Sequence, residues 1–113
     1  MKLEFEKCMH ILENLLSYCH ALGSDRFHME LGHEKDKMLL FIRADIDGLT
    51  DERLEEMQEA LSIPRQREVE TNYWELIGDY GDEGELGLVG MMVDRADVVY
   101  RYGELCILLE RKL

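Results

Sequence analysis

The sequence is an acidic chain of 113 residues, with 25 aspartate and glutamate residues against 13 lysine and arginine residues and a formal net charge of −12. This length predicts a single domain over residues 1–113 that buries one hydrophobic core without disulfides or a metal. The charge disfavours nucleic acid and anionic membranes as partners, because both carry the same sign. A neutral or basic protein is the expected partner.

Neither a signal peptide nor a membrane span is expected. The N-terminus lacks a charged segment followed by an apolar one, and no apolar run approaches the roughly 18 residues that a membrane span requires. The three cysteines lie far apart in the sequence and form neither a disulfide framework nor a zinc motif. We therefore expect a cytoplasmic protein with reduced thiols.

Apolar residues recur at three- and four-residue steps from Leu3 to Leu22, which is the period of one helix face. Gly23 ends this predicted helix. A second row, beside the apolar stripe, contains Asn14 and Tyr18. The expected core stripe consists of Phe5, Cys8, Met9, Leu12, Leu15, Leu16, Cys19 and Leu22.

Two strands are predicted after this helix. Residues Arg26 to Gly32 alternate between apolar and polar, which is typical of a strand with one dry face. After a polar turn at 33–36, the apolar run from Met38 to Ile46 predicts a buried strand antiparallel to the first. Leu39 and Phe41 alternate with the core-facing residues of this strand, so they predict an uncovered sheet face that self-associates.

Further helices are predicted in the second half of the chain. Thr50 precedes two acidic residues, which favours a helix from Thr50 to Ile63 that Pro64 ends. Residues Arg65 to Asp82 predict a short amphipathic helix. Residues Gly84 to Arg95 carry apolar residues at helical steps and predict a helix with a glycine-rich start.

Two strands close the predicted fold. Val98 to Tyr102 and Leu105 to Glu110 predict a hairpin, with Gly103-Glu104 as the central residues of a type II′ turn. The element order predicts an α+β fold, a two-layer sandwich with helices on one face of a mainly antiparallel four-stranded sheet.

Four segments carry a resemblance to a known family. Leu12 to Cys19, Asp47-Gly48-Leu49, Glu85 to Leu88 and the closing hairpin Gly103 to Arg111 follow one another along the chain. In this order they resemble the motifs of the GHKL, or Bergerat-fold, ATPase domains of histidine kinases and anti-sigma-factor kinases. The resemblance covers nearly the whole chain.

The resemblance implies a role for each matched position. Asn14 stands at the position of the general base or polar partner, and Tyr18 at that of the magnesium-binding asparagine. Asp47 stands where the family binds the adenine amino group, followed by Gly48 of the same box. The phosphate-wrapping segment matches Glu85 and Gly87.

The chain departs from the family at the nucleotide-binding positions. Tyr18 offers a phenol, which is a poorer ligand for a hard cation than an amide carbonyl. Leu49 replaces a glycine, and Glu85 places a carboxylate where a triphosphate is expected. The resemblance therefore implies weak or absent binding of ATP and Mg²⁺, with no catalytic residue and no metal site.

The leading hypothesis is a degenerate histidine-kinase-like domain that works in signal transduction as a regulatory or protein-interaction module. One alternative is an active kinase that binds ATP and Mg²⁺. A second is a self-associating structural subunit, which forms a homodimer. At the Asp47-Gly48 pair, the residues alone also favour a simple turn before the helix that Thr50 caps.

Overall fold

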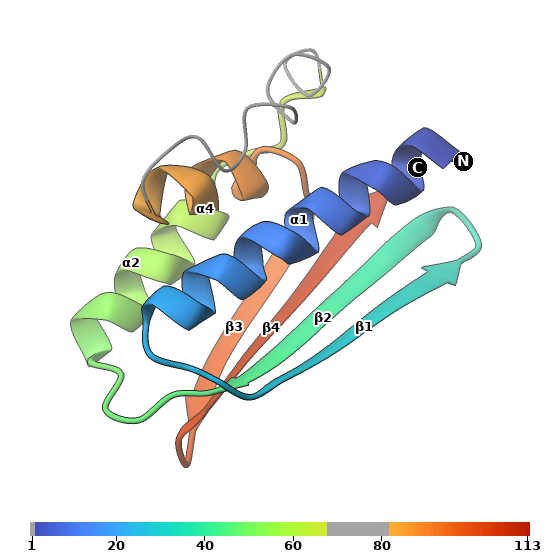
Figure 1. Ribbon diagram of the computed structural model, residues 1–113. Coiled ribbons are helices and arrows are strands. Elements are labelled where there is room, and N and C mark those ends of the chain that lie inside the picture. The colour runs from blue at the N-terminus through green and yellow to red at the C-terminus, as the bar shows by residue number, and fades with distance from the viewer. Residues whose placement is uncertain (1, 68–81) are drawn as a thin grey trace.

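The structure, a computed structural model, describes residues 2–67 and 82–113. Within these ranges three helices lie on one face of a four-stranded sheet, as Figure 1 shows. This two-layer arrangement confirms the predicted α+β fold. The elements in chain order are α1 (Lys2–Ala21), β1 (Phe27–Glu34), β2 (Lys37–Asp45), α2 (Asp51–Leu61), α4 (Asp82–Gly90), β3 (Arg95–Arg101) and β4 (Glu104–Lys112).

The sheet has the strand order β1-β2-β4-β3, and all three neighbouring pairs are antiparallel. The β3–β4 turn differs from the predicted type II′ turn at Gly103-Glu104. Arg101 pairs with Glu104, so the central residues are Tyr102 and Gly103. Both have a positive φ, 53° and 77°, which defines a type I′ turn and shows that the prediction was wrong by one residue.

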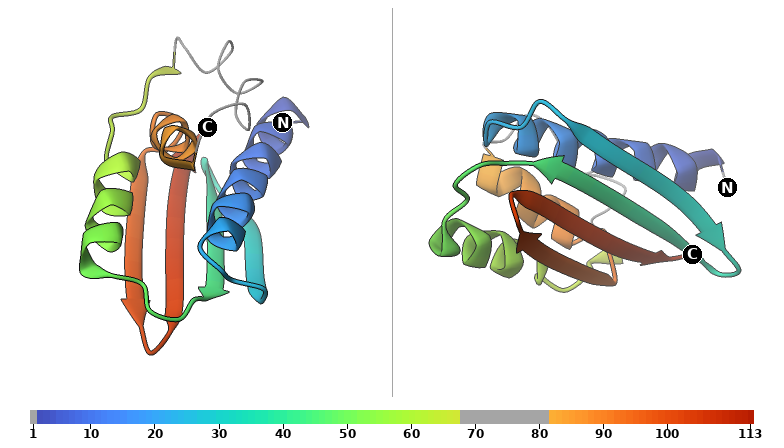
Figure 2. Two further views of the ribbon diagram at one scale, coloured as in Figure 1. Left: turned by 60° about the vertical axis from the view of Figure 1, so that its left-hand side comes forward. Right: turned by 90° about the horizontal axis from the view of Figure 1, so that it is seen from below.

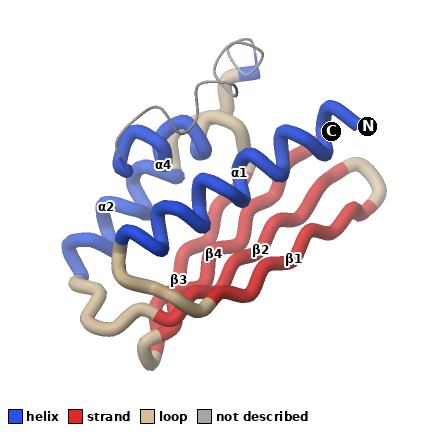
Figure 3. Tube along the Cα trace, viewed as in Figure 1, coloured by secondary structure: helices blue, strands red, loops and turns tan. Residues whose placement is uncertain are grey.

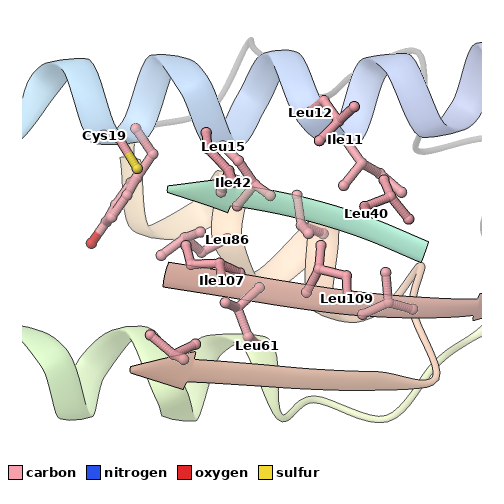
Figure 4. Packing of buried hydrophobic residues seen from close by; sticks show 14 of the residues in the cluster. Ile11, Leu12, Leu15, Cys19, Leu40, Ile42, Leu61, Leu86, Ile107 and Leu109 are labelled. Carbon is pink, nitrogen blue, oxygen red and sulfur yellow. The ribbon is translucent and has the colours of Figure 1, made fainter. Parts of the chain in front are cut away.

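Alternate residues of the two central strands form the floor of the core. Leu40 and Ile42 of β2 lie beside Leu109 and Ile107 of β4, and all four side chains are fully buried. Figure 4 shows them beneath α1, whose Leu15 reaches down from the helix.

The buried stripe of α1 is displaced from the predicted one. Cys8 and Cys19 are fully buried, as expected, but Phe5 and Met9 are 51% and 37% exposed. Lys7, Ile11, Asn14 and Tyr18, a row that the sequence places beside the stripe, are buried instead. The helix is therefore rotated toward this row, because α4 packs against that side.

The helix α2 begins as predicted. The hydroxyl of Thr50 accepts a hydrogen bond from the backbone N–H of Arg53 at 3.1 Å, which satisfies one of the free donors of the first turn. The helix ends at Leu61, three residues before Pro64.

The last predicted helix is shorter than expected. It begins at Asp82 and ends at Gly90, so Val93 and Ala96 lie outside it, and Arg95 already starts β3. A Cβ on Gly90 would lie 2.5 Å from the carbonyl oxygen of Ala60. Glycine therefore allows α4 to cross close to the end of α2. Most of the helix predicted for 65–82 lies outside the described residues.

Candidate functional site

The turn after β2 is held by the hydroxyl of a tyrosine in the edge strand β3. Tyr100 Oη donates to the carbonyl oxygen of Ile46 at 2.6 Å and accepts from the backbone N–H of Leu49 at 3.4 Å. Between these two residues Gly48 adopts a φ of +71°, which glycine tolerates without strain, and Asp47 is exposed. The two hydrogen bonds of Tyr100 therefore fix the turn that leads into α2.

The carboxylate of Asp47 lies near the tip of the closing hairpin. A Cβ on Gly103 would be 3.8 Å from Asp47 Oδ1, and the carbonyl oxygen of Gly103 accepts from the backbone N–H of Ile46 at 2.8 Å. The turn and the hairpin tip therefore support one another.

Asn14 of α1 is buried and points along its own helix. Its amide Nδ2 donates to the carbonyl oxygen of His10, one turn earlier, at 2.7 Å. An asparagine that bonds its own helix in this way satisfies a buried polar group.

Tyr18 lines a groove between the three helices. The groove has a volume of about 320 Å³, and Tyr18 shares it with Leu86 of α4 and Ala60 of α2. Two glutamates of α2, Glu56 and Glu59, complete the lining. None of the described lining residues is basic, so the groove presents negative charge.

The structure brings together only part of the predicted site. Tyr18 shares a groove with Leu86, which lies between Glu85 and Gly87 in the sequence, and all three of these residues are inside the helix α4. Gly87 therefore lies within the helix, as the prediction of a helix from Gly84 to Arg95 requires. Asp47 does not line this groove.

The pairing of the strands defines a second candidate surface, on the face of the sheet away from the helices. The face of the sheet opposite the helices carries an apolar strip, in which Phe41 pairs with Leu108, and Cys106 pairs with Val99. Leu39 extends the strip, and Val99 and Leu108 are 47% and 38% exposed. Figure 3 shows that no described helix covers this face. We call the apolar strip and the charged residues around it the open sheet face.

The charges around the strip are nearly balanced. Five basic residues stand against six acidic ones, whereas the whole chain has 13 against 25. The excess negative charge therefore lies elsewhere. The charged residues of the open sheet face are Lys37, Arg43, Arg95, Arg101, Lys112, Glu30, Glu34, Asp45, Asp97, Glu104 and Glu110.

The two ends of the open sheet face differ in how their charges are paired. At one end, Glu110 binds Lys37 at 2.8 Å and Arg95 at 3.7 Å. The hydrogen bond from Lys37 is the main cause that holds the pKa of Glu110 below its usual value. At the other end, Arg43 and Arg101 make no ion pair with a described residue.

A depression of about 520 Å³ lies at this second end. Arg26 and Arg43 line it, together with Asp25, Asp45 and the ring of His28. Sequence reasoning found the open sheet face only through Leu39 and Phe41, because their neighbours on one side come from β4, about 70 residues later in the chain.

The described residues contain no group of three or more histidine, cysteine, aspartate or glutamate side chains placed to hold a metal ion. No described helix is both long and apolar enough to cross a membrane. In the comparisons with known proteins, no protein-family model matches the chain and no curated protein matches its sequence.

Proposed function

We propose that this protein is a non-catalytic regulatory module that binds a partner protein on its open sheet face. The observation that carries the proposal is the exposed apolar strip around Phe41 and Leu108, on a face that no described helix covers. Exposed apolar patches ringed by polar residues mark interaction sites in soluble proteins. The near balance of charge around the strip lets a partner approach a chain that is otherwise strongly acidic.

The chemistry of the open sheet face specifies the partner. Apolar side chains of the partner would cover Phe41, Leu108 and Val99. At the depression a polar side chain of the partner would pair with Arg43, in a lining where Asp25 and Asp45 balance the charge of the two arginines. Because the chain carries a net charge of −12, the partner as a whole is neutral or basic.

The groove beside Tyr18 supports the non-catalytic part of the proposal. A nucleotide phosphate requires positive charge or free backbone donors, and here Glu56 and Glu59 stand in the lining. The likeness to histidine-kinase ATPase domains remains a hypothesis about origin. An active kinase is the second candidate. It would retain Asp47 and Asn14 as matched positions and take a further magnesium ligand such as Glu13.

Titration calorimetry with millimolar ATP and Mg²⁺ separates these two functions. The non-catalytic module gives no binding heat. Tight binding that depends on Mg²⁺ and is lost in Asp47→Ala would replace this proposal by the kinase.

Partner binding is tested by affinity capture from the source cell, followed by calorimetry with the purified partner. We expect Phe41→Glu and Arg43→Glu each to weaken binding by about tenfold or more, which is typical of a residue at the centre of an interface. Leu3→Glu is the matched control, because Leu3 is 53% exposed on α1, away from the sheet. Equal affinity for all four proteins would place the partner elsewhere and reject the proposal.

A further inference from the structure

The two edges of the sheet differ in how other parts of the chain contact them. β1 and β3 are the edge strands, and Figure 2 shows α2 beside β3. The side chain of Gln58 in α2 donates from Nε2 to the backbone oxygen of Val98 at 3.2 Å. Among the described residues, no side-chain hydrogen bond reaches the backbone of β1. The outer edge of β1 is therefore available to another strand.

β1 also lacks several of the features by which natural edge strands avoid pairing, although it carries Glu30 and Glu34. It runs regularly along β2 from Phe27 to Glu34 without a bulge, and it contains neither proline nor lysine. The carbonyl oxygen of Arg26 accepts from the backbone N–H of Asp45 at 3.2 Å, so the even-numbered residues bond inward to β2. The backbone groups of the odd-numbered residues then point outward, away from the sheet.

The side chains of these odd-numbered residues lie on the helix side of the sheet and are incompletely covered. Met29 is 43% exposed, and Phe27 and Leu31 are half-buried. An added strand would therefore gain apolar contacts as well as backbone hydrogen bonds.

The flank of α1 above this edge is also apolar. Phe5 and Met9 are 51% and 37% exposed, and Leu16 is half-buried. At 100° per residue, these three lie on the opposite flank of the helix from Tyr18, and Tyr18 faces α2 and α4. Phe5, Met9 and Leu16 therefore continue the apolar surface of Met29 toward the solvent beyond β1.

We propose that two copies of this chain pair antiparallel through β1, with Met29 opposite Met29 of the second copy. The two four-stranded sheets then form one continuous sheet, with all helices on the same side. In this register Phe27 stands opposite Leu31 of the second copy, so the helix-side pairs between residues 27 and 31 are all apolar. On the other side His28 stands opposite Glu30 of the second copy.

The charges of the strand favour this register over one centred on Glu30. His28 and Glu30 already form a pair within one chain, with Nε2 and Oε1 2.9 Å apart. In the dimer, His28 of each copy can pair with Glu30 of the other copy instead. A register centred on Glu30 would instead place two carboxylates directly opposite one another, which destabilises a strand pair. The strand is thus complementary to itself from Phe27 to Leu31, which favours a second copy as the occupant.

Sedimentation velocity of the full chain tests the dimer. We expect a dimer at protein concentrations of about tens of micromolar, and a monomer for Met29→Glu, which opposes two carboxylates at the twofold axis. Leu3→Glu and Phe41→Glu remain dimeric, with unchanged circular dichroism in all variants. A wild-type monomer at these concentrations, or a dimer lost in Phe41→Glu but kept in Met29→Glu, would overturn the proposal. The second outcome would place self-association on the open sheet face.

Cysteine cross-linking tests the register without relying on a disruptive substitution. Directly opposed residues of a hydrogen-bonded antiparallel pair have Cα atoms about 5.5 Å apart, within the range of a disulfide. In a Cys106→Ser background, Met29→Cys should therefore oxidise to a covalent dimer on non-reducing gels. Glu30→Cys is the matched control, because its copies are not opposite one another in this register. Cross-linking of Glu30→Cys in preference to Met29→Cys, or of neither, would contradict the proposed pairing.

The dimer does not depend on the partner proposed for the open sheet face. Loss of partner binding in Phe41→Glu with the dimer intact supports both proposals. Loss of the dimer in Met29→Glu with partner binding intact separates the two surfaces. Should partner binding survive both substitutions, only the function proposed for the open sheet face fails.

Discussion

Arg111 near the end of β4 and Glu4 in the first turn of α1 form an ion pair that joins the two ends of the chain. Arg111 Nε donates to Glu4 Oε2 at 2.9 Å, and its Nη2 donates to Oε1 at 3.3 Å. The guanidinium is completely buried, and its Nη1 donates to the carbonyl oxygen of Met92 at 2.6 Å. The pair therefore fixes α1 over the sheet and also holds the segment between α4 and β3.

Removal of the carboxylate should destabilise the protein strongly. Glu4→Gln removes a negative charge that lies against a buried guanidinium, which costs about 3 kcal/mol of unfolding free energy. Arg111→Met should cost less, because the side chain of Glu4 is 27% exposed and can be hydrated when its partner is absent. Urea unfolding of the two variants measures both values. A larger loss in Arg111→Met than in Glu4→Gln would contradict this account.

The Tyr100 hydroxyl should stabilise the turn that precedes α2. Tyr100→Phe removes the bonds to Ile46 and Leu49, and we expect a loss of about 1 kcal/mol, the usual net value of such a hydrogen bond. Amide hydrogen exchange at Leu49 should accelerate, while exchange in the centre of β4 changes only as far as global stability falls. Unchanged exchange at Leu49 would show that the backbone alone holds the turn.

Asp94 should make stability depend on pH. Burial raises the pKa of its carboxyl group, but hydrogen bonds from the backbone N–H of Lys112 and from Arg65 outweigh this, so the pKa is lowered overall. A group with a depressed folded-state pKa stabilises the fold above its unfolded pKa and loses this effect as the pH falls through the folded value.

We therefore expect Asp94→Asn to cost about 1–2 kcal/mol at pH 7, where the carboxylate is ionised in both states. The difference from wild type should shrink as the pH falls from about 5 to below the folded-state pKa. Unfolding free energies of the two proteins across this range provide the measurement. A difference that stays constant with pH would exclude the carboxylate charge as its source.

Local patterns were sufficient to predict much of the fold. Alternation predicted β1, an apolar run predicted β2, and the Thr50 cap predicted the start of α2, because these features depend on neighbours in the sequence. The rotation of α1 was not predictable in this way. It depends on α4, more than 60 residues later in the chain, which packs against the row that contains Tyr18.

At the candidate site, too, local sequence motifs did not predict which residues lie together in the fold. Motif spacing suggested that Tyr18, Asp47 and Gly87 belong together, but spacing carries no information about distance in the fold. In the structure Asp47 lies beside Gly103, whereas Tyr18 lies beside Leu86. The open sheet face was predicted from Phe41, and its full extent required the register with β4.

The three cysteines should differ in their reactivity toward a thiol reagent, and Cys106 should report on the open sheet face. Burial raises the pKa of Cys8 to about 11 and that of Cys19 to about 12, and both thiols are fully buried in the core. Cys106 is only half-buried on the open sheet face, and its pKa is raised mainly by burial. Because the thiolate is the reactive form, only Cys106 should react with a thiol reagent at pH 8 in the folded protein.

Mass spectrometry after alkylation measures this order. One label is expected in the native protein and three in urea. Pairing through β1 should leave the labelling rate of Cys106 unchanged, because this residue lies on β4, two strands from the β1 edge. A partner on the open sheet face should slow it, since the partner would cover the strip between Phe41 and Val99. Labelling of Cys8 before Cys106 would contradict the described packing of α1, and unslowed labelling of Cys106 in the partner complex would place the partner on another surface.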